Sequence, residues 1–195
     1  MMDQTAGAST ERLTATRSKA GRFDQVSIAF HWLTLALVVG QLTTAFLLIT
    51  ASDGEAALLT LHRSMGLVTW MVVAGRLAWR ASGAAHLPPF PASMPKPQQL
   101  AARLNEYGLY ALLLLQPLTG LGDTVFRGHP FTLVVWRIPA LVHADKPVFH
   151  AFHAAHELGA IVLVALIGLH AAAALLHGLV LHDGVLQRMW PWTAR

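Results

Sequence analysis

The chain has 195 residues, of which 54% are hydrophobic and only 12% are charged, and its formal net charge is +4. A soluble globular domain carries about 25% charged residues, so this composition argues against an ordinary soluble protein and favours a lipid bilayer as the main solvent. The basic residues stand in short clusters between apolar runs, a pattern that suits membrane orientation and excludes a nucleic-acid-binding surface.

Cysteine is absent, whereas histidine occurs 11 times. The chain therefore has no disulfide framework, no thiolate metal site, no iron–sulfur cluster and no motif for covalent haem attachment. Any metal must be bound through nitrogen or oxygen, and histidine is the residue available to supply the ligands.

A polar arm precedes the first apolar segment. Residues 1–24 have a basic bias and are expected to form a flexible arm. From Gln25 to Ser52 there are 28 residues without any charge, whereas roughly 20 suffice to cross the hydrocarbon core. We therefore predict the first transmembrane helix at about residues 27–50.

The second and third spans are separated by a proline-rich segment. The second span is predicted at about 57–79, where two arginines lie near enough to the ends to reach the membrane surface. Residues 82–99 are rich in proline and are expected to form a loop without helix. The third span is predicted at about 100–126, with a kink at Pro117 that membrane helices tolerate.

The longest predicted loop, residues 127–149, precedes the fourth span. That span is predicted at about 148–182, and its 25 residues from Leu158 to His182 carry no charge. A short tail follows at 191–195. The sequence thus predicts an all-α integral membrane protein, in which one transmembrane domain at 25–190 forms an up-and-down four-helix bundle.

Lysine and arginine are distributed unevenly between the two sides of this bundle. The side that contains both termini and the loop between the second and third spans holds ten of them, and the other side holds four. Because cytoplasmic segments carry the excess of positive charge, both termini are expected in the cytoplasm.

Four histidines fall on the spans at two levels. His31 lies near the inner end of the first span, and His62 near the outer end of the second, because consecutive helices run in opposite directions. The fourth span enters from outside, so it carries His156 near the outer leaflet and His170 deeper. Topology therefore places His62 level with His156 and His31 level with His170.

The spacing on the fourth span supports this arrangement. His156 and His170 are 14 residues apart, so both rings leave one face of the helix within about 40° and lie about 21 Å apart along its axis. Two such ligands, each facing a histidine of another helix, form the geometry of a bundle that holds two b haems. Because paired histidines leave no axial position open, such sites favour electron transfer over oxygen binding.

Other residues near these positions have alternative interpretations. A lone intramembrane histidine often only bonds a neighbour, and either His150 or His153 could replace His156 as a ligand. His177 is a candidate quinone-site residue, whereas His182 is expected at the membrane surface. Nearby glycines could admit a porphyrin or could serve helix packing: Gly66, Gly75, Gly159 and Gly168. The remaining histidines are expected in solvated loops: His86, His129 and His143.

Several segments are similar to those of the bacterial cytochrome b561 family of dihaem membrane proteins. The matching segments are RFDQVSIAFHWL around His31, LHRSMG around His62, Arg76 and Arg80 after it, QPLTGL, FRGHPF, HELG at His156, and IGLHAAAALLH at His170 and His177. The resemblance extends from Arg22 to Pro191, and the last segment is the most specific.

The resemblance implies two haem b groups held by the histidine pairs that topology brings level. It implies electron exchange with ubiquinone in the bacterial inner membrane, with His177 and Arg80 beside a quinone on the cytoplasmic side. In better-understood members superoxide is oxidised at the periplasmic face. By count the outer side holds four basic and five acidic residues, so attraction of this anion depends on local clustering. The candidate residues are Arg63, Arg127 and Arg137.

Three functions compete at this point. The first is an enzyme that passes electrons from superoxide through two haems to quinone. The second is a haem-containing subunit that links a periplasmic partner enzyme to the quinone pool, and a homodimer is compatible with either. The third is a transporter that uses intramembrane histidines for metal ions or protons, against which the scarcity of acidic residues in the spans argues.

Overall fold

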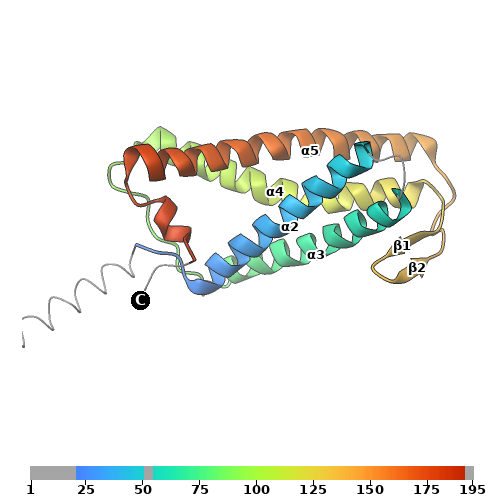
Figure 1. Cartoon of the computed structure of the whole chain (residues 1–195), viewed down its shortest axis with the longest axis horizontal. Coiled ribbons are helices and arrows are strands. Elements are labelled where there is room, and N and C mark those ends of the chain that lie inside the picture. Colours follow the sequence, from blue (N-terminus) through green and yellow to red (C-terminus); the bar gives the residue numbers. More distant parts are fainter. Residues whose placement is uncertain (1–20, 51–54, 192–195) are drawn as a thin grey trace, which may run out of the picture.

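A computed structural model of the chain describes residues 21–50 and 55–191, and the predicted arm and tail lie almost entirely outside these ranges. Four long helices form an up-and-down bundle within the described part (Figure 1). They are α2 (Gln25–Thr50), α3 (Glu55–Ala81), α4 (Lys96–Phe126) and α5 (Lys146–Leu175). Each is long and apolar enough to cross a membrane, which confirms the predicted all-α membrane fold.

The start of α2 is determined by Asp24. Its carboxylate accepts hydrogen bonds from the backbone N–H of Ser27 at 2.9 Å and from the Ser27 hydroxyl at 2.7 Å, so Asp24 caps the helix. The same carboxylate accepts a bond from the indole N–H of Trp79 at 3.2 Å and from the backbone N–H of His86 at 3.0 Å. Asp24 therefore joins the first turn of α2 to the end of α3 and to the loop beyond it.

The expectation that residues 82–99 contain no helix is wrong at its end, because α4 already begins at Lys96. Pro97 lies in the first turn of α4, where the missing N–H would have had no partner within the helix. Pro117 lies inside the same helix, as predicted.

The predicted loop at 127–149 contains a small hairpin that sequence patterning did not indicate. Strand β1 (Phe131–Leu133) pairs antiparallel with β2 (Trp136–Ile138), and the register joins Phe131 to Ile138 and Leu133 to Trp136. The hairpin lies beside α3 at the end of the bundle opposite to the start of α2, which we call the outer end after the predicted orientation (Figure 1). Beyond it, Asp145 caps α5 by accepting a bond from the backbone N–H of Val148 at 3.1 Å.

The fourth helix does not end at the last residue of α5. It continues as a π-helical turn, η1 (Leu176–Leu181), and then reverses at His182, whose φ of 50° lies in the left-handed region. A short helix, η2 (Leu186–Met189), follows. Its end is tied back to the bundle, because the indole N–H of Trp32 donates to the carbonyl of Met189 at 2.8 Å.

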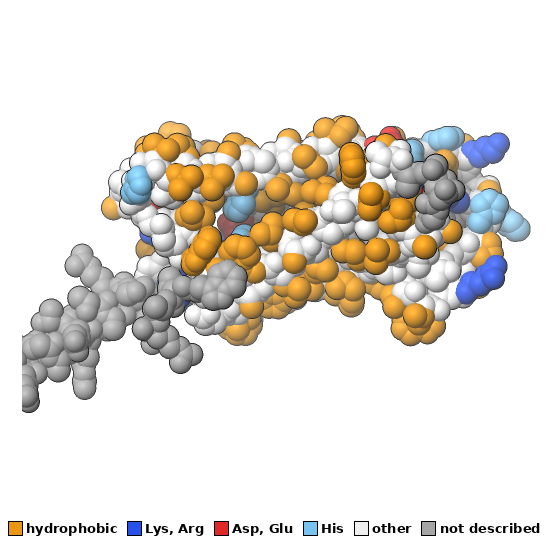
Figure 2. Space-filling view, in the orientation of Figure 1, with side chains coloured by type: hydrophobic (Ala, Val, Ile, Leu, Met, Phe, Trp, Pro, Cys, Tyr) orange, Lys and Arg blue, Asp and Glu red, His pale blue; other side chains and the backbone are white. Residues whose placement is uncertain are grey.

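The bundle is closely packed on only three of its sides. Helix α2 packs along α3, α4 packs along α5, and α3 contacts α4, whereas α2 and α5 are not a closely packed pair. Figure 2 shows the surface hollowed between these two helices, with histidine at the bottom of the hollow. Apolar side chains cover much of the visible outer surface, and residues such as Ile49 are 84% exposed. This outward apolar surface is what a lipid environment requires.

Candidate functional site

The inner end of the hollow interior contains His31 and His170. His31 extends from α2 and His170 from α5, and their ring centroids are 6.2 Å apart with an interplanar angle of 54°. No hydrogen bond reaches either ring within residues 21–50 and 55–191. Arg76 lies on the α3 side, where its guanidinium stands 5.4 Å from the ring centre of Tyr110. The two imidazoles therefore face each other across a gap with their nitrogens unengaged.

The outer pair is His62 on α3 and His156 on α5, with ring centroids 6.3 Å apart and planes at 88°. Here one nitrogen of each ring is engaged. Nδ1 of His156 lies 3.0 Å from the carbonyl oxygen of Gln116 and 3.1 Å from the hydroxyl of Thr119. Nδ1 of His62 lies 2.9 Å from the hydroxyl of Thr44.

The contact between His156 and Gln116 decides which ring nitrogen carries the proton. A backbone carbonyl can only accept a hydrogen bond, so Nδ1–H of His156 donates and Nε2 keeps its lone pair. Metal-binding histidines are commonly oriented in this way by a bond from the second nitrogen. The outer pair is therefore arranged so that the free nitrogen can act as a ligand.

The ring separations fit a metal ion between the members of each pair. A metal–imidazole bond is about 2 Å long, so two rings that share a metal have centres about 6 Å apart. Within the described part of the chain no group of three or more His, Asp or Glu side chains gathers to hold a metal ion. The pairs thus suit a metal whose remaining ligands come from a flat macrocycle.

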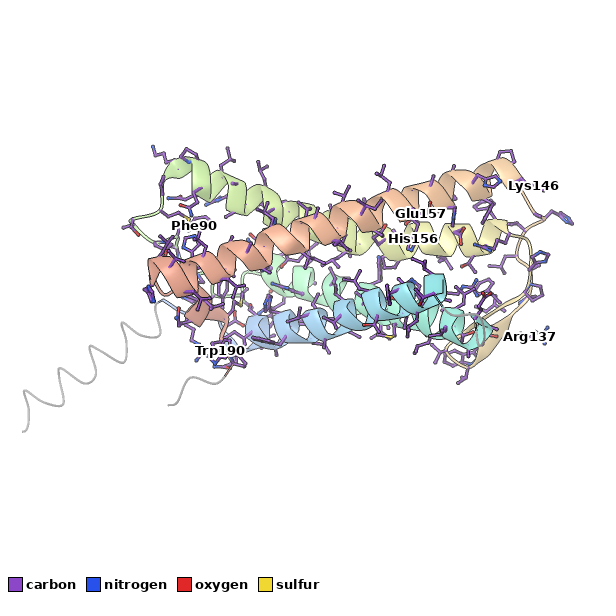
Figure 3. All side chains as sticks on the ribbon, turned by 45° about the horizontal axis from the view of Figure 1, so that its top comes forward. Phe90, Arg137, Lys146, His156, Glu157 and Trp190 are labelled. Carbon is purple, nitrogen blue, oxygen red and sulfur yellow. The ribbon has the colours of Figure 1, made fainter. Side chains whose placement is uncertain are left out.

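The two pairs lie at different depths of the bundle. The 14 residues of α5 between His156 and His170 correspond to about 21 Å along the helix axis. Figure 3 shows His156 in the half of α5 nearer the β hairpin, with its side chain directed toward the other helices. The arrangement is that of two sites in one bundle, one toward each face of the membrane.

Glycine provides the space for one of these rings. A Cβ atom at Gly120 would lie 3.0 Å from Cε1 of His156, closer than ordinary contact. Of the glycines singled out from the sequence, three pack against side chains, namely Gly66 against Gln41, Gly75 against Phe30 and Gly159 against Gln116, while Gly168 faces open space. Gly120, which sequence analysis did not select, has the direct contact with a site residue.

His177 is buried within the π turn beyond α5. Its Nε2 lies 2.9 Å from the amide nitrogen of Gln98, and its Nδ1–H donates to the carboxylate of Asp183. Burial alone would raise the pKa of Asp183, but the hydrogen bonds from His177 and from the backbone N–H of Val185 outweigh it and lower the pKa. A π turn is frequent at functional sites, and here it presents a histidine to a carboxylate.

Arg80 lies elsewhere at the same end of the molecule. It forms an ion pair with Glu106 of α4, and both residues line a cleft of about 520 Å³ whose walls include Phe23, Phe90 and Tyr107. His177 does not line this cleft. Of the two residues that the sequence assigns to one quinone site, Arg80 lines this cleft and His177 contacts Gln98, the neighbour of the cleft residue Gln99.

The model of the prokaryotic cytochrome b561 family matches residues 22–192 of the chain. The chain belongs to this family. A cytochrome b561 homologue of Escherichia coli (homolog 2) is 32% identical over 176 residues, covering 86% of this chain and 90% of the relative. A probable superoxide oxidase, CybB, of Yersinia pestis is 28% identical over 174 residues, covering 87% of this chain and 96% of the relative.

Membership of the cytochrome b561 family indicates which cofactor the bundle binds. The chain is a multi-pass membrane b-type cytochrome of electron transport, and haem b binding follows from the family. A b haem is held by axial ligands without a covalent link to cysteine, which agrees with the absence of cysteine from the sequence.

The three outer arginines of this cytochrome differ in their surroundings. Arg63, next to His62, donates from Nε to the hydroxyl of Thr124 at 3.0 Å and lies 5.8 Å from the ring centre of Phe131. Arg127 forms an ion pair with Asp123 at 3.1 Å. Arg137 is exposed at the hairpin (Figure 3). Of the three, Arg63 lies next to an outer histidine and bonds a hydroxyl, and no carboxylate of the described residues forms an ion pair with it.

The other histidines considered as outer ligands have different neighbours. His153 lies 3.2 Å from Asp123 and 3.4 Å from Glu157, and the His150 ring centre is 4.9 Å from that of Phe149. Sequence reasoning missed the residues that orient the outer pair, above all Thr44 and Gln116. A polar side chain inside a charge-free span is the signal that could have identified them.

Proposed function

We propose that each facing histidine pair of this cytochrome supplies both axial ligands of one haem b, His62 with His156 on the outer side and His31 with His170 on the inner side. The observation that carries the proposal is the presence of two facing pairs, 6.3 and 6.2 Å apart between ring centres, in a bundle whose surface is hollowed between α2 and α5 (Figure 2). When bound, a haem with both axial positions filled exchanges single electrons with its neighbours.

The protein's own residues hold the two sites in place within lipid. Neutral imidazole is the ligand form, so its burial in a membrane costs far less than that of a charged group. Helix α5 carries one ligand of each pair and so fixes the separation of the sites at about 21 Å along its axis. The chain thereby provides an electron path between the two faces of the membrane.

At the inner end we propose that electrons are delivered to ubiquinone. Reduction of a quinone to a quinol takes up two electrons and two protons. His177 lies seven residues beyond His170, and its imidazole is hydrogen-bonded to Asp183 and to the amide of Gln98. The cleft beside Arg80 supplies aromatic walls and hydrogen-bond donors. The excess of basic residues on this side supports a cytoplasmic location for it and for both termini.

At the outer end we propose superoxide as the electron donor. Two superoxide anions would give two molecules of oxygen and two electrons, which balance the reduction of one quinone. The probable superoxide oxidase among the relatives supports this donor. The positive charge of Arg63 beside His62 would favour approach of an anion, with Arg127 and Arg137 further out.

The test is quinone reduction by the purified cytochrome in lipid with a flux of superoxide. We expect quinol to form with the wild-type protein and not with His62→Ala, whereas Arg63→Gln should lower the rate more at low ionic strength than at high. Electrons that enter only through a co-purifying periplasmic protein, with no response to superoxide, would show that the chain is instead a subunit serving a partner enzyme.

A further inference from the structure

The tip of the β hairpin carries an apolar surface that the electron path does not use. Val134, Val135 and Trp136 are 43%, 78% and 67% exposed. On the other side of the hairpin turn, Phe131 is buried against the bundle. Directly paired residues share one face of a hairpin, so Phe131 with Ile138 and Leu133 with Trp136 form one apolar face. The base of this face is covered by protein and its tip is not.

The turn itself is built from residues that turn chemistry disfavours. Val134 and Val135 are the two central residues, and Val134 has a φ of 57°. Glycine, asparagine or aspartate suits such positions, whereas a β-branched residue with positive φ is strained. Valine at position 134 therefore weakens the turn, and folding of the hairpin alone gives no reason for it.

The depth of the tip is determined by its bond to α3. The backbone N–H of Val134 donates to the hydroxyl of Ser64 at 2.7 Å. The preceding residue of α3, Arg63, is bonded to Thr124 in the last turn of α4, near the ion pair of Asp123 and Arg127. The tip thus lies level with the charged ends of the spans, where hydrocarbon gives way to headgroups.

We propose that the tip of the hairpin, Val134 to Trp136, inserts into the outer leaflet at the boundary between headgroups and acyl chains, and so anchors the hairpin whose base packs on Arg63, the neighbour of His62. Its apolar surface is continuous with the lipid-facing surface of α3, where Leu61 is 49% exposed three residues from Ser64. Tryptophan is enriched at this depth, and Arg137 beside it can reach a lipid phosphate.

The same anchor holds a wall of the outer site. Phe131 is buried and lies under the guanidinium of Arg63, the neighbour of His62. A hairpin fixed in lipid at its tip and packed on Arg63 at its base keeps that arginine in position. A hairpin free in water would leave Arg63 covered by a two-stranded ribbon of marginal stability.

The absence of cysteine allows a direct test. Single cysteines replace Val135 or Trp136 in the full chain, which is reconstituted with haem in lipid nanodiscs and spin-labelled. Leu47→Cys is the lipid control, because Leu47 is 40% exposed on the side of α2 opposite the buried Val38. His143→Cys, in the exposed segment before α5, is the aqueous control. The haem-to-protein ratio confirms that each variant is folded.

We expect the labels at 135 and 136 to collide with dissolved oxygen more than with a water-soluble nickel chelate, as at 47 and opposite to 143. The proposal would be overturned if the labels at both hairpin positions collided with the two reagents in the same proportion as the label at position 143. A label shielded from both reagents would also overturn it, because it would show that protein, either a second copy or a partner, covers the tip.

Discussion

Thr44 and Thr43 are neighbours on α2 with the same side chain and different roles. Both hydroxyls donate to a carbonyl of their own helix, that of Thr44 to Gln41 at 2.9 Å and that of Thr43 to Val39 at 2.8 Å, but only the Thr44 hydroxyl also lies 2.9 Å from Nδ1 of His62. Outer partners of a ligating histidine typically change metal affinity about 10- to 100-fold when removed. We expect Thr44→Val to lower the affinity of the outer haem by about tenfold, measured by haem titration of the apoprotein, and Thr43→Val to have no effect. Equal losses in both variants would indicate a general helix defect.

Asp24 gives a prediction about stability and pH. Burial alone would raise its pKa, but hydrogen bonds from Ser27, His86 and Trp79 outweigh it and lower the pKa below the usual range of aspartate. A lowered folded pKa stabilises the protein above the unfolded value of about 3.9, and this contribution is lost as the pH falls through the folded pKa. Asp24→Ala should cost about 0.5–2 kcal/mol of cap energy at neutral pH.

The measurement for Asp24 is thermal unfolding followed by the visible haem spectrum at several pH values. Asp24→Asn is the matched variant, because asparagine caps a helix as well as aspartate does but carries no charge to titrate. We expect it to keep most of the stability at neutral pH and to lose the part of the acid sensitivity that comes from Asp24. A wild-type acid response unchanged in Asp24→Asn would contradict this role.

At the scale of the helices, one turn of α4 positions the outer ligand. Gln116, whose carbonyl receives the bond from His156, precedes Pro117 inside this helix. One turn on, Gly120 leaves room for the His156 ring. Gly120→Ala should displace the ring and shift the spectrum and midpoint potential of the outer haem. Gly75→Ala, whose Cβ would meet Phe30 at 3.5 Å, should leave both unchanged. An unaltered potential in Gly120→Ala would show that the ring tolerates the added carbon.

The long helices could be predicted because each is marked by a continuous stretch of sequence and not by contacts with distant residues. Charge-free runs mark helices whatever they pack against, and alternation of direction then places His31, His62, His156 and His170 in order along the membrane normal. The hairpin could not be predicted in this way, because its two strands have only three residues each and depend on contacts with α3. The sequence predicts a loop at Lys96 because proline commonly ends a helix. In the structure Pro97 instead lies in the first turn of α4.

At the scale of the whole molecule, the apolar side chains are directed mostly outward. Only six apolar residues are buried within residues 21–50 and 55–191, whereas exposed apolar side chains occur along all four long helices, as a lipid environment requires. The residues that close the inner end were also beyond sequence patterning, because Asp183, Gln98 and Glu106 act through contacts between distant segments. Of these three residues, only Asp183 has a recognisable position in the sequence, because it is a carboxylate directly after a charge-free span.

Whether two histidine pairs hold two haems is decided by a reduced-minus-oxidised visible spectrum combined with a haem-to-protein ratio. We expect a ratio near two for the wild-type protein, and loss of one haem in His156→Ala and of the other in His170→Ala, with different midpoint potentials for the haems that remain. A ratio of one, or loss of the same haem in both variants, would contradict the arrangement of two sites.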